Sequence, residues 1–141
     1  MGQRFWISSI VAAILFCLLG FVIHETVLHN DYAQVAGIYR TSEEALRRMP
    51  IMFLAYLLMG FASTWIYRQG IAASASWLLQ GIRFGIALAL VSAVPMYLIY
   101  YAVQPLPVSL VVKQSVLQTI AIVLVGIVIA LINRRSSIST V

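Results

Sequence analysis

The side chains best suited to chemistry gather in one short stretch of the 141-residue chain, from His24 to Asp31, which reads HETVLHND. Imidazoles and carboxylates at such spacing serve as metal ligands or as general acids and bases. The stretch is similar to the zinc motif H-E-x-x-H, but one extra residue separates His24 from His29. Because five residues of α-helix turn a side chain by about 140°, we expect no metal site and no catalytic set here.

The other reactive side chains form no recognisable catalytic arrangement. Cys17 is the single cysteine, so no disulfide can form within the chain. It lies deep in an apolar segment, where a thiolate is disfavoured, and no histidine lies within one helical turn of it. A glycine-rich phosphate loop is also absent from the sequence. We therefore expect no cofactor.

The composition places these residues in a membrane protein. Hydrophobic residues make up 62% of the chain and charged residues only 9%, whereas soluble domains carry about 25% charged residues. The net charge of +5 comes from residues at the ends of apolar segments and not from a clustered basic stripe, which excludes a nucleic-acid partner. The expected partner is the lipid bilayer, together with other membrane-protein subunits or a second copy of this chain.

Four apolar segments predict an all-α membrane protein with four transmembrane helices in an up-down bundle. They cover residues 5–27, 50–67, 78–103 and 116–132, and we expect the first to stay uncleaved. Pro95 should kink the third helix, because it cannot donate to the carbonyl of Val91, while Ser92 can help to satisfy the backbone. Residues 1–135 would form one domain, and 136–141 a short polar tail.

The charges predict the orientation in the membrane. Four spans place both termini on one side, with five arginines there against four basic residues on the other side, and all four acidic residues lie opposite the termini. The positive-inside rule then predicts a multi-pass protein of the bacterial inner membrane with both termini in the cytoplasm.

Small residues predict where the helices touch, since helices in lipid associate through close backbone contact. Gly81, Gly85 and Ala89 line one face of the third span, and Gly60 and Gly126 repeat the pattern on the second and fourth spans. We interpret this pattern as packing within the monomer, with a seam between copies as the alternative.

The outer loop after the first span contains a helix start signal. Thr41 and Glu44 form a capping box, which predicts a short interfacial helix that ends near Met49 and leads into Pro50. If the preceding helix continues to His29, the side chains of Glu25 and His29 face the same way and can pair.

The topology also brings the end of the third span to the outer side. We hypothesise a pocket there for a lipid headgroup, a quinone or a small polar solute, approached by Lys113, Gln114 and Gln118 of the fourth span. The alternative is an ordinary interfacial belt of aromatics and paired charges. The pocket would be formed by His24, Glu25, His29, Asp31, Tyr97, Tyr100, Tyr101 and Gln104.

Several short motifs resemble a group of small four-helix bacterial inner-membrane proteins that have no assigned activity. The resemblance covers most of the chain and supports the fold and the compartment alone. Its residues are Ile23-His24, Tyr32, Tyr39-Arg40, Gly81 and Gly85, Tyr101-Ala102-Val103 and Pro105-Leu106-Pro107.

Three functions remain open from the sequence. The leading one is a non-enzymatic accessory or interaction subunit, because the spans carry no ionisable group near their centres. The second is a small oligomeric transporter or channel, favoured by the small-residue stripe and Pro95. The third is a metal- or haem-binding membrane enzyme that uses His24, Glu25 and His29.

Overall fold

Every regular element of the computed structural model is helical within residues 2–72 and 75–134, which are the residues that the structure describes. Four stretches are long and apolar enough to cross a membrane: Gln3–Val27, Met49–Gln69, Trp77–Val103 and Val108–Asn133. The predicted all-α class and the number of spans are therefore confirmed. The predicted tail, 136–141, and the predicted domain end at residue 135 lie outside the described residues.

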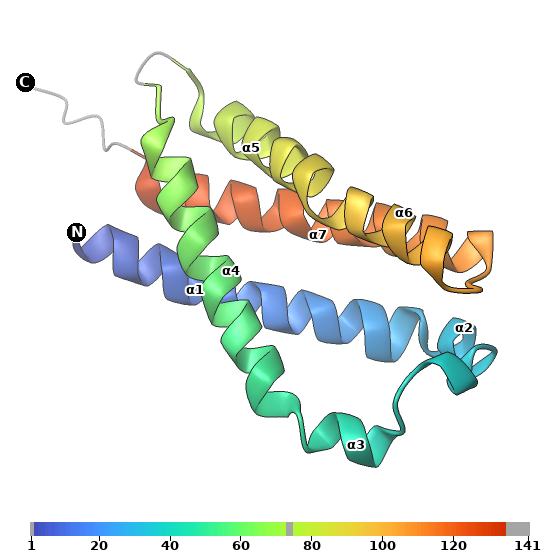
Figure 1. Ribbon diagram of the computed structural model, residues 1–141. Coiled ribbons are helices and arrows are strands. Elements are labelled where there is room, and N and C mark those ends of the chain that lie inside the picture. Colours follow the sequence, from blue (N-terminus) through green and yellow to red (C-terminus); the bar gives the residue numbers. More distant parts are fainter. Residues whose placement is uncertain (1, 73–74, 135–141) are drawn as a thin grey trace, which may run out of the picture.

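The spans consist of helices α1, α4, α5, α6 and α7, and a π-helical turn, η1, extends α1 (Figure 1). Two short helices and a 3₁₀ turn connect η1 to α4. The bounds are α1 Gln3–Phe21, η1 Val22–Val27, α2 His29–Ala33, η2 Ala36–Ile38, α3 Ser42–Leu46, α4 Met49–Gln69, α5 Trp77–Val91, α6 Ala93–Val103 and α7 Val108–Asn133.

The fourth span begins earlier than the sequence predicts. Residue 116 is the expected start, but α7 begins at Val108, directly after Pro107. Lys113 and Gln114 look too polar for a membrane helix, and both find partners in the structure: Lys113 pairs with Asp31 and Gln114 with Tyr32. Pairing lowers the cost of placing these groups on the span.

The third span is interrupted at Ser92, between the end of α5 and the start of α6. The amide of Ser92 donates to the carbonyl of Leu88 at 3.1 Å, and the Ser92 hydroxyl donates to the same carbonyl. Pro95, three residues later, has no N–H to offer the carbonyl of Val91. The serine hydroxyl thus supplies a donor where the helical bonding is broken.

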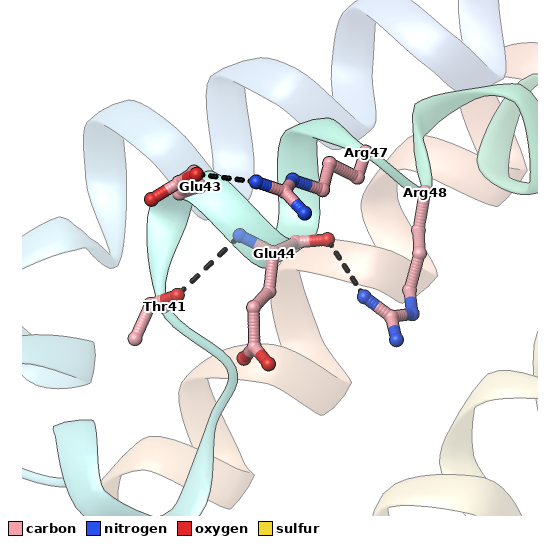
Figure 2. A network of polar contacts seen from close by, with 5 residues as sticks. All are labelled: Thr41, Glu43, Glu44, Arg47 and Arg48. Carbon is pink, nitrogen blue, oxygen red and sulfur yellow. Dashed lines mark hydrogen bonds and ion pairs between the residues drawn. The ribbon is translucent and has the colours of Figure 1, made fainter.

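The predicted interfacial helix forms as α3, but it is shorter than expected because it ends at Leu46 and not near Met49. Figure 2 shows its start, where the amide of Glu44 donates to the Thr41 hydroxyl at 3.3 Å, and its exposed ion pair, in which Arg47 lies 2.7 Å from Glu43. The carboxylate of Glu44 points away from Thr41, so one half of the capping box is made. Such an exposed pair contributes about 0.3–0.5 kcal/mol.

Glycines set the helix contacts. A Cβ on Gly60 would lie 2.5 Å from the backbone oxygen of Ser9, so α4 and α1 touch backbone to backbone. On the other side, a Cβ on Gly85 would lie 2.5 Å from the Cα of Val123, and one on Gly126 would lie 2.7 Å from the oxygen of Gly81. These glycines lie in contacts within the chain, between α1 and α4 and between α5 and α7.

Helices α1 and α7 form the middle of the molecule, with α4 crossing α1 and the α5–α6 pair running along α7 (Figure 1). Ala12 and Phe16 of α1 pack with Ile122 and Ile129 of α7 in one buried cluster. At one end, which we call the terminal end, the Arg4 guanidinium donates to the carbonyl of Arg134 at 2.9 Å. We call the opposite end, which carries α2 and α3, the loop end.

The loop-end half of α4 packs less closely than its second half, although Tyr56 still contacts α1 at Gly20. Figure 1 shows α4 diverging from α6 towards α3. The buried residues of α4 all lie in its second half, at Gly60, Ser63, Thr64 and Tyr67, and α6, which is described throughout, has none. Residues 49–58 of α4 and the helix α6 therefore present surfaces without buried residues on two of the spans, and we call these two surfaces together the α4–α6 wedge.

The close α5–α7 contact predicts the effect of one added methyl group. Gly85→Ala should lower the free energy of unfolding by about 1–3 kcal/mol, because its Cβ would meet the backbone of Val123. Gly70→Ala is the control, since nothing lies within 4 Å of its Cβ position. Reversible unfolding in detergent measures both variants, and equal stabilities would contradict the helix contact.

Candidate functional site

A π-helical turn reshapes the chain at the residues that carry the chemistry. The amide of Leu28 donates to the carbonyl of Ile23 at 2.9 Å, which is a bond across five residues. Leu28 is fully buried, and its own carbonyl accepts from the amide of Tyr32 at 3.0 Å. The chain therefore reverses around Leu28, and the condition for a pair between Glu25 and His29, an α-helix that continues to His29, is not met. π-Turns of this kind recur at functional sites.

The reversal brings together three polar side chains from three elements, which we call the polar triad: His24 of η1, Tyr32 of α2 and Gln114 of α7. The Tyr32 hydroxyl lies 2.6 Å from Nδ1 of His24 and accepts a hydrogen bond from Nε2 of Gln114 at 2.8 Å. Because the phenol oxygen already accepts from Gln114, its own O–H is free to donate to Nδ1 of His24. His24 then carries its ring proton on Nε2.

The environment of the triad keeps Tyr32 in its neutral, donating form. Burial raises the pKa of the Tyr32 phenol above its usual value of 10.0, and the carboxylates of Glu25 and Asp31 act in the same direction, although the hydrogen bond from Gln114 opposes them. A phenol whose pKa is raised stays protonated at neutral pH. Tyr32 is therefore a hydrogen-bond donor and not a phenolate.

Gln114 is the most buried member of the triad, with 3% of its surface exposed. Its Nε2 is paired with Tyr32, but its Oε1 is buried without a hydrogen-bond partner among the described residues. A buried carbonyl oxygen that lacks a donor costs about 1–3 kcal/mol. The Gln114 amide therefore uses its donor end, Nε2, and leaves its acceptor end, Oε1, unpaired.

A salt bridge one residue away also joins α2 to α7. Nζ of Lys113 contacts the two carboxylate oxygens of Asp31 at 2.7 and 3.0 Å. The Asp31 side chain is 19% exposed and that of Lys113 is 51% exposed. Adjacent residues of α2 thus bind adjacent residues of α7, and the loop end is fastened to the fourth span.

Aromatic rings surround the triad. Tyr39 stacks edge-on against Tyr32, with ring centroids 5.1 Å apart, and Tyr97 packs against the buried cluster around Leu28. Tyr100 lies edge-on to Tyr97 at 6.5 Å. Tyrosines from the loop and from α6 therefore enclose the hydrogen-bonded group on the side of the wedge.

The structure places the hypothesised pocket residues in two groups. His24, Asp31 and Tyr97 lie in or against the triad and its aromatic surround, with Tyr100 beside Tyr97. Glu25, His29 and Tyr101 are exposed, and no contact between described residues joins Glu25 to His29. Gln104 ends α6, where its backbone carbonyl accepts from Leu106 at 2.7 Å.

Tyr32 is missing from the hypothesised pocket set, and Gln114 appears only as a residue that approaches the pocket from the fourth span. Tyr32 follows His24 by eight positions, and no regular helix spacing links them without the π-turn. The signal for Gln114 is that it is a polar residue inside an apolar helix and next to Lys113. Such a residue needs a partner, and the search for one leads to the outer loop.

The chemistry available to the triad is hydrogen bonding and proton binding. Within residues 2–72 and 75–134, no three side chains of His, Cys, Asp or Glu converge as ligands of a metal ion. An open groove of about 400 Å³ is lined by Val27, Val112, Lys113, Val116 and Leu117. That groove is apolar and does not include the triad.

Comparisons of the chain with protein-family models, with curated proteins and with solved structures found no match. The resemblance to small four-helix inner-membrane proteins therefore stays a prediction. What the chain does has to be argued from its own geometry.

The triad predicts the effect of removing one oxygen atom. Tyr32→Phe should weaken the attachment of α2 by about 1–3 kcal/mol, because His24 and Gln114 both lose a buried partner. Tyr39→Phe is the matched control, since its ring is 40% exposed and stacks on the same site. Backbone hydrogen exchange over residues 29–38 measures the attachment. Equal protection in the two variants would show that the triad does not hold the loop.

Proposed function

We propose that the chain is a non-enzymatic accessory or interaction subunit of a membrane, and that it binds a transmembrane helix of a partner protein in the α4–α6 wedge. The observation that carries this proposal is the lack of burial on the two surfaces of the wedge. Residues 49–58 of α4 and all of α6 contain no buried residue, although both belong to membrane spans and lie at their loop ends. Helices in multi-spanning proteins normally pack along much of their length.

Small side chains beside the wedge favour a helix as its occupant. A cavity of about 150 Å³ lies between α4 and the end of α5, and Ala62, Ser63 and Ser92 line it together with larger apolar residues: Phe16, Met59, Ile66, Leu88 and Ile122. Small residues allow two helix backbones to approach closely, which is the main source of affinity between helices in lipid.

The composition of the spans argues against the other two functions. A transporter or channel needs a polar path or an ionisable group at mid-membrane, and Arg83 and Lys113 lie near opposite ends of their helices. The enzyme hypothesis relied on His24, Glu25 and His29. Nδ1 of His24 is engaged by Tyr32, and the other two side chains are exposed.

The proposed setting is the bacterial inner membrane, with the four spans as an up-down bundle and both termini in the cytoplasm. Arg4 and Arg134 lie together at the terminal end, beside Arg68, whose guanidinium stacks 5.7 Å from the ring centre of Phe5. All four acidic residues lie between Glu25, near the end of the first span, and Glu44 in the first loop, towards the other end. This distribution supports a cytoplasmic terminal end under the positive-inside rule.

Site-specific photo-crosslinking in intact membranes tests the wedge. A photoreactive residue at Met52 should crosslink to one partner protein, because Met52 continues the helical face of Met59 towards the loop end. The matched control is Leu54, which lies two positions on and points about 200° away. Ala62→Leu, which fills the cavity beside the wedge, should abolish the Met52 crosslink.

The outcomes of that experiment separate the candidates. A membrane-spanning partner that is captured from Met52, not from Leu54, and lost in Ala62→Leu supports the proposal. Crosslinks to lipid alone would overturn it. Crosslinks between copies of this chain would favour the oligomeric alternative over an accessory role.

The orientation has an independent test. Green fluorescent protein fused after residue 134 should fluoresce, and alkaline phosphatase fused at the same point should be inactive, because the positive-inside rule keeps this end in the cytoplasm. A phosphatase inserted at Gly37, in the first loop, should be active. The opposite pattern at both sites would reverse the topology and leave the helix packing unaffected.

A further inference from the structure

The proposed role of the wedge does not account for the unpaired oxygen of Gln114. Its amide donates to Tyr32 and leaves Oε1 without a partner among the described residues. Only 3% of the surface of Gln114 is exposed. An amide has a donor end and an acceptor end of nearly the same shape, and a half-turn exchanges them. The same position can therefore offer Tyr32 either a donor or an acceptor.

His24 has a matching property at the other end of the triad. When the ring is neutral, Nδ1 accepts from the Tyr32 hydroxyl across 2.6 Å. When the ring binds a proton, Nδ1 becomes a donor, and Tyr32 can no longer donate to it. The tyrosine hydrogen then needs another acceptor, and Oε1 of Gln114 is the buried acceptor without a donor.

We propose that His24, Tyr32 and Gln114 form a reversible hydrogen-bond relay that binds one proton at Nδ1 of His24. In the neutral state, Gln114 donates to Tyr32 and Tyr32 donates to His24. In the protonated state, the direction reverses: His24 donates to Tyr32, and Tyr32 donates to Oε1 of Gln114 after the amide has turned. The proton comes from water at the membrane surface, one N–H bond forms on His24, and the Tyr32 O–H bond stays intact.

Charged or titratable side chains from the neighbouring elements surround the relay. Glu25 follows His24 on the same turn, and Asp31 and Tyr39 lie close to Tyr32. From α7, Lys113 is engaged by Asp31, and from α6, Tyr97 packs against the same cluster. Among these groups, Glu25 carries the negative charge nearest to His24 along the chain.

The relay holds the loop end in both states. Tyr32 keeps two hydrogen bonds whether or not His24 is protonated, so α2 stays attached to η1 and α7. Proton binding is therefore predicted to turn the Gln114 amide without releasing the loop. This inference is independent of the wedge and of any partner.

Nuclear magnetic resonance of the protein in nanodiscs tests the reversal directly. In a His29→Gln background, His24 is the single imidazole, and its ring nitrogens report its tautomer and its protonation. We expect the neutral ring to carry its proton on Nε2. Through-space contacts from the Gln114 side-chain NH₂ to the Tyr32 ring should be strong in that state and weaken with the same midpoint as His24. A neutral ring protonated on Nδ1, a Gln114 amide that stays fixed as His24 titrates, or a His24 that does not titrate would overturn the proposal.

Substitution of Gln114 supplies a second measurement. Gln114→Met keeps the volume but removes both ends of the amide. In the neutral state the Tyr32 oxygen loses a donor but its O–H still donates to His24, whereas in the protonated state the Tyr32 O–H is left without an acceptor, which costs more. The midpoint of the His24 titration should move to lower pH by about one unit, a tenfold loss in proton affinity. Gln118→Met, one turn further along α7, is the control and should leave the midpoint in place. Equal midpoints in the two variants would mean that Gln114 takes no part.

Discussion

Four apolar helices in hydrocarbon gain little by hiding their leucines from lipid, because the lipid is as apolar as the side chains. What holds them is close backbone contact and the polar ties that lipid cannot replace. Both are visible here, since a Cβ on Gly60 or Gly85 would lie 2.5 Å from an atom of the neighbouring helix. The α1–α4 and α5–α7 pairs depend on these contacts, and the two pairs meet where α1 packs on α7.

The two ends of the molecule are fastened by polar groups in different ways. At the terminal end, the amide of Asn133 donates to the Ser8 hydroxyl at 3.1 Å, and both side chains are buried. At the loop end, the chain itself folds back, so that Tyr32 and Asp31 bind Gln114 and Lys113. The second half of α4 packs on α1 through buried residues, whereas its first half reaches α1 through Tyr56 at Gly20 and has no buried residue. The wedge thus consists of the least buried parts of two spans.

The sequence predicts the spans well and the site less well, for physical reasons. Apolar length determines a membrane helix almost alone, so the α1–η1 span, α4 and the α5–α6 pair begin and end within about two residues of their predicted bounds. The predicted start of α7 is too late because Lys113 and Gln114, taken without their partners, look too polar for a membrane helix. Their partners lie 82 positions away in the chain. No local pattern reports such a pairing.

The π-turn is the other feature that periodicity misses. A continuous α-helix with about 3.6 residues per turn would place Glu25 beside His29. The bond from Leu28 to Ile23 spans five residues, and it ends the regular helix before His29. His24 then faces Tyr32, a residue that the helical register would have put out of reach. Tyr32, Asp31 and His24 could each be noticed in the sequence, but the turn that joins them depends on burying Leu28.

Gln114 connects these observations in energetic terms. Its amide donates to Tyr32 with one end and leaves the other end buried without a hydrogen-bond partner among the described residues, which costs stability in the state that the structure shows. The proposed relay gives this second end a partner in another state. Protonation of His24 creates that state, because it turns the acceptor of Tyr32 into a donor. Tyr97 packs against the same buried cluster from α6, a helix that has no buried residue. The protonated and neutral forms of the triad therefore differ at the boundary between the anchored loop end and the wedge.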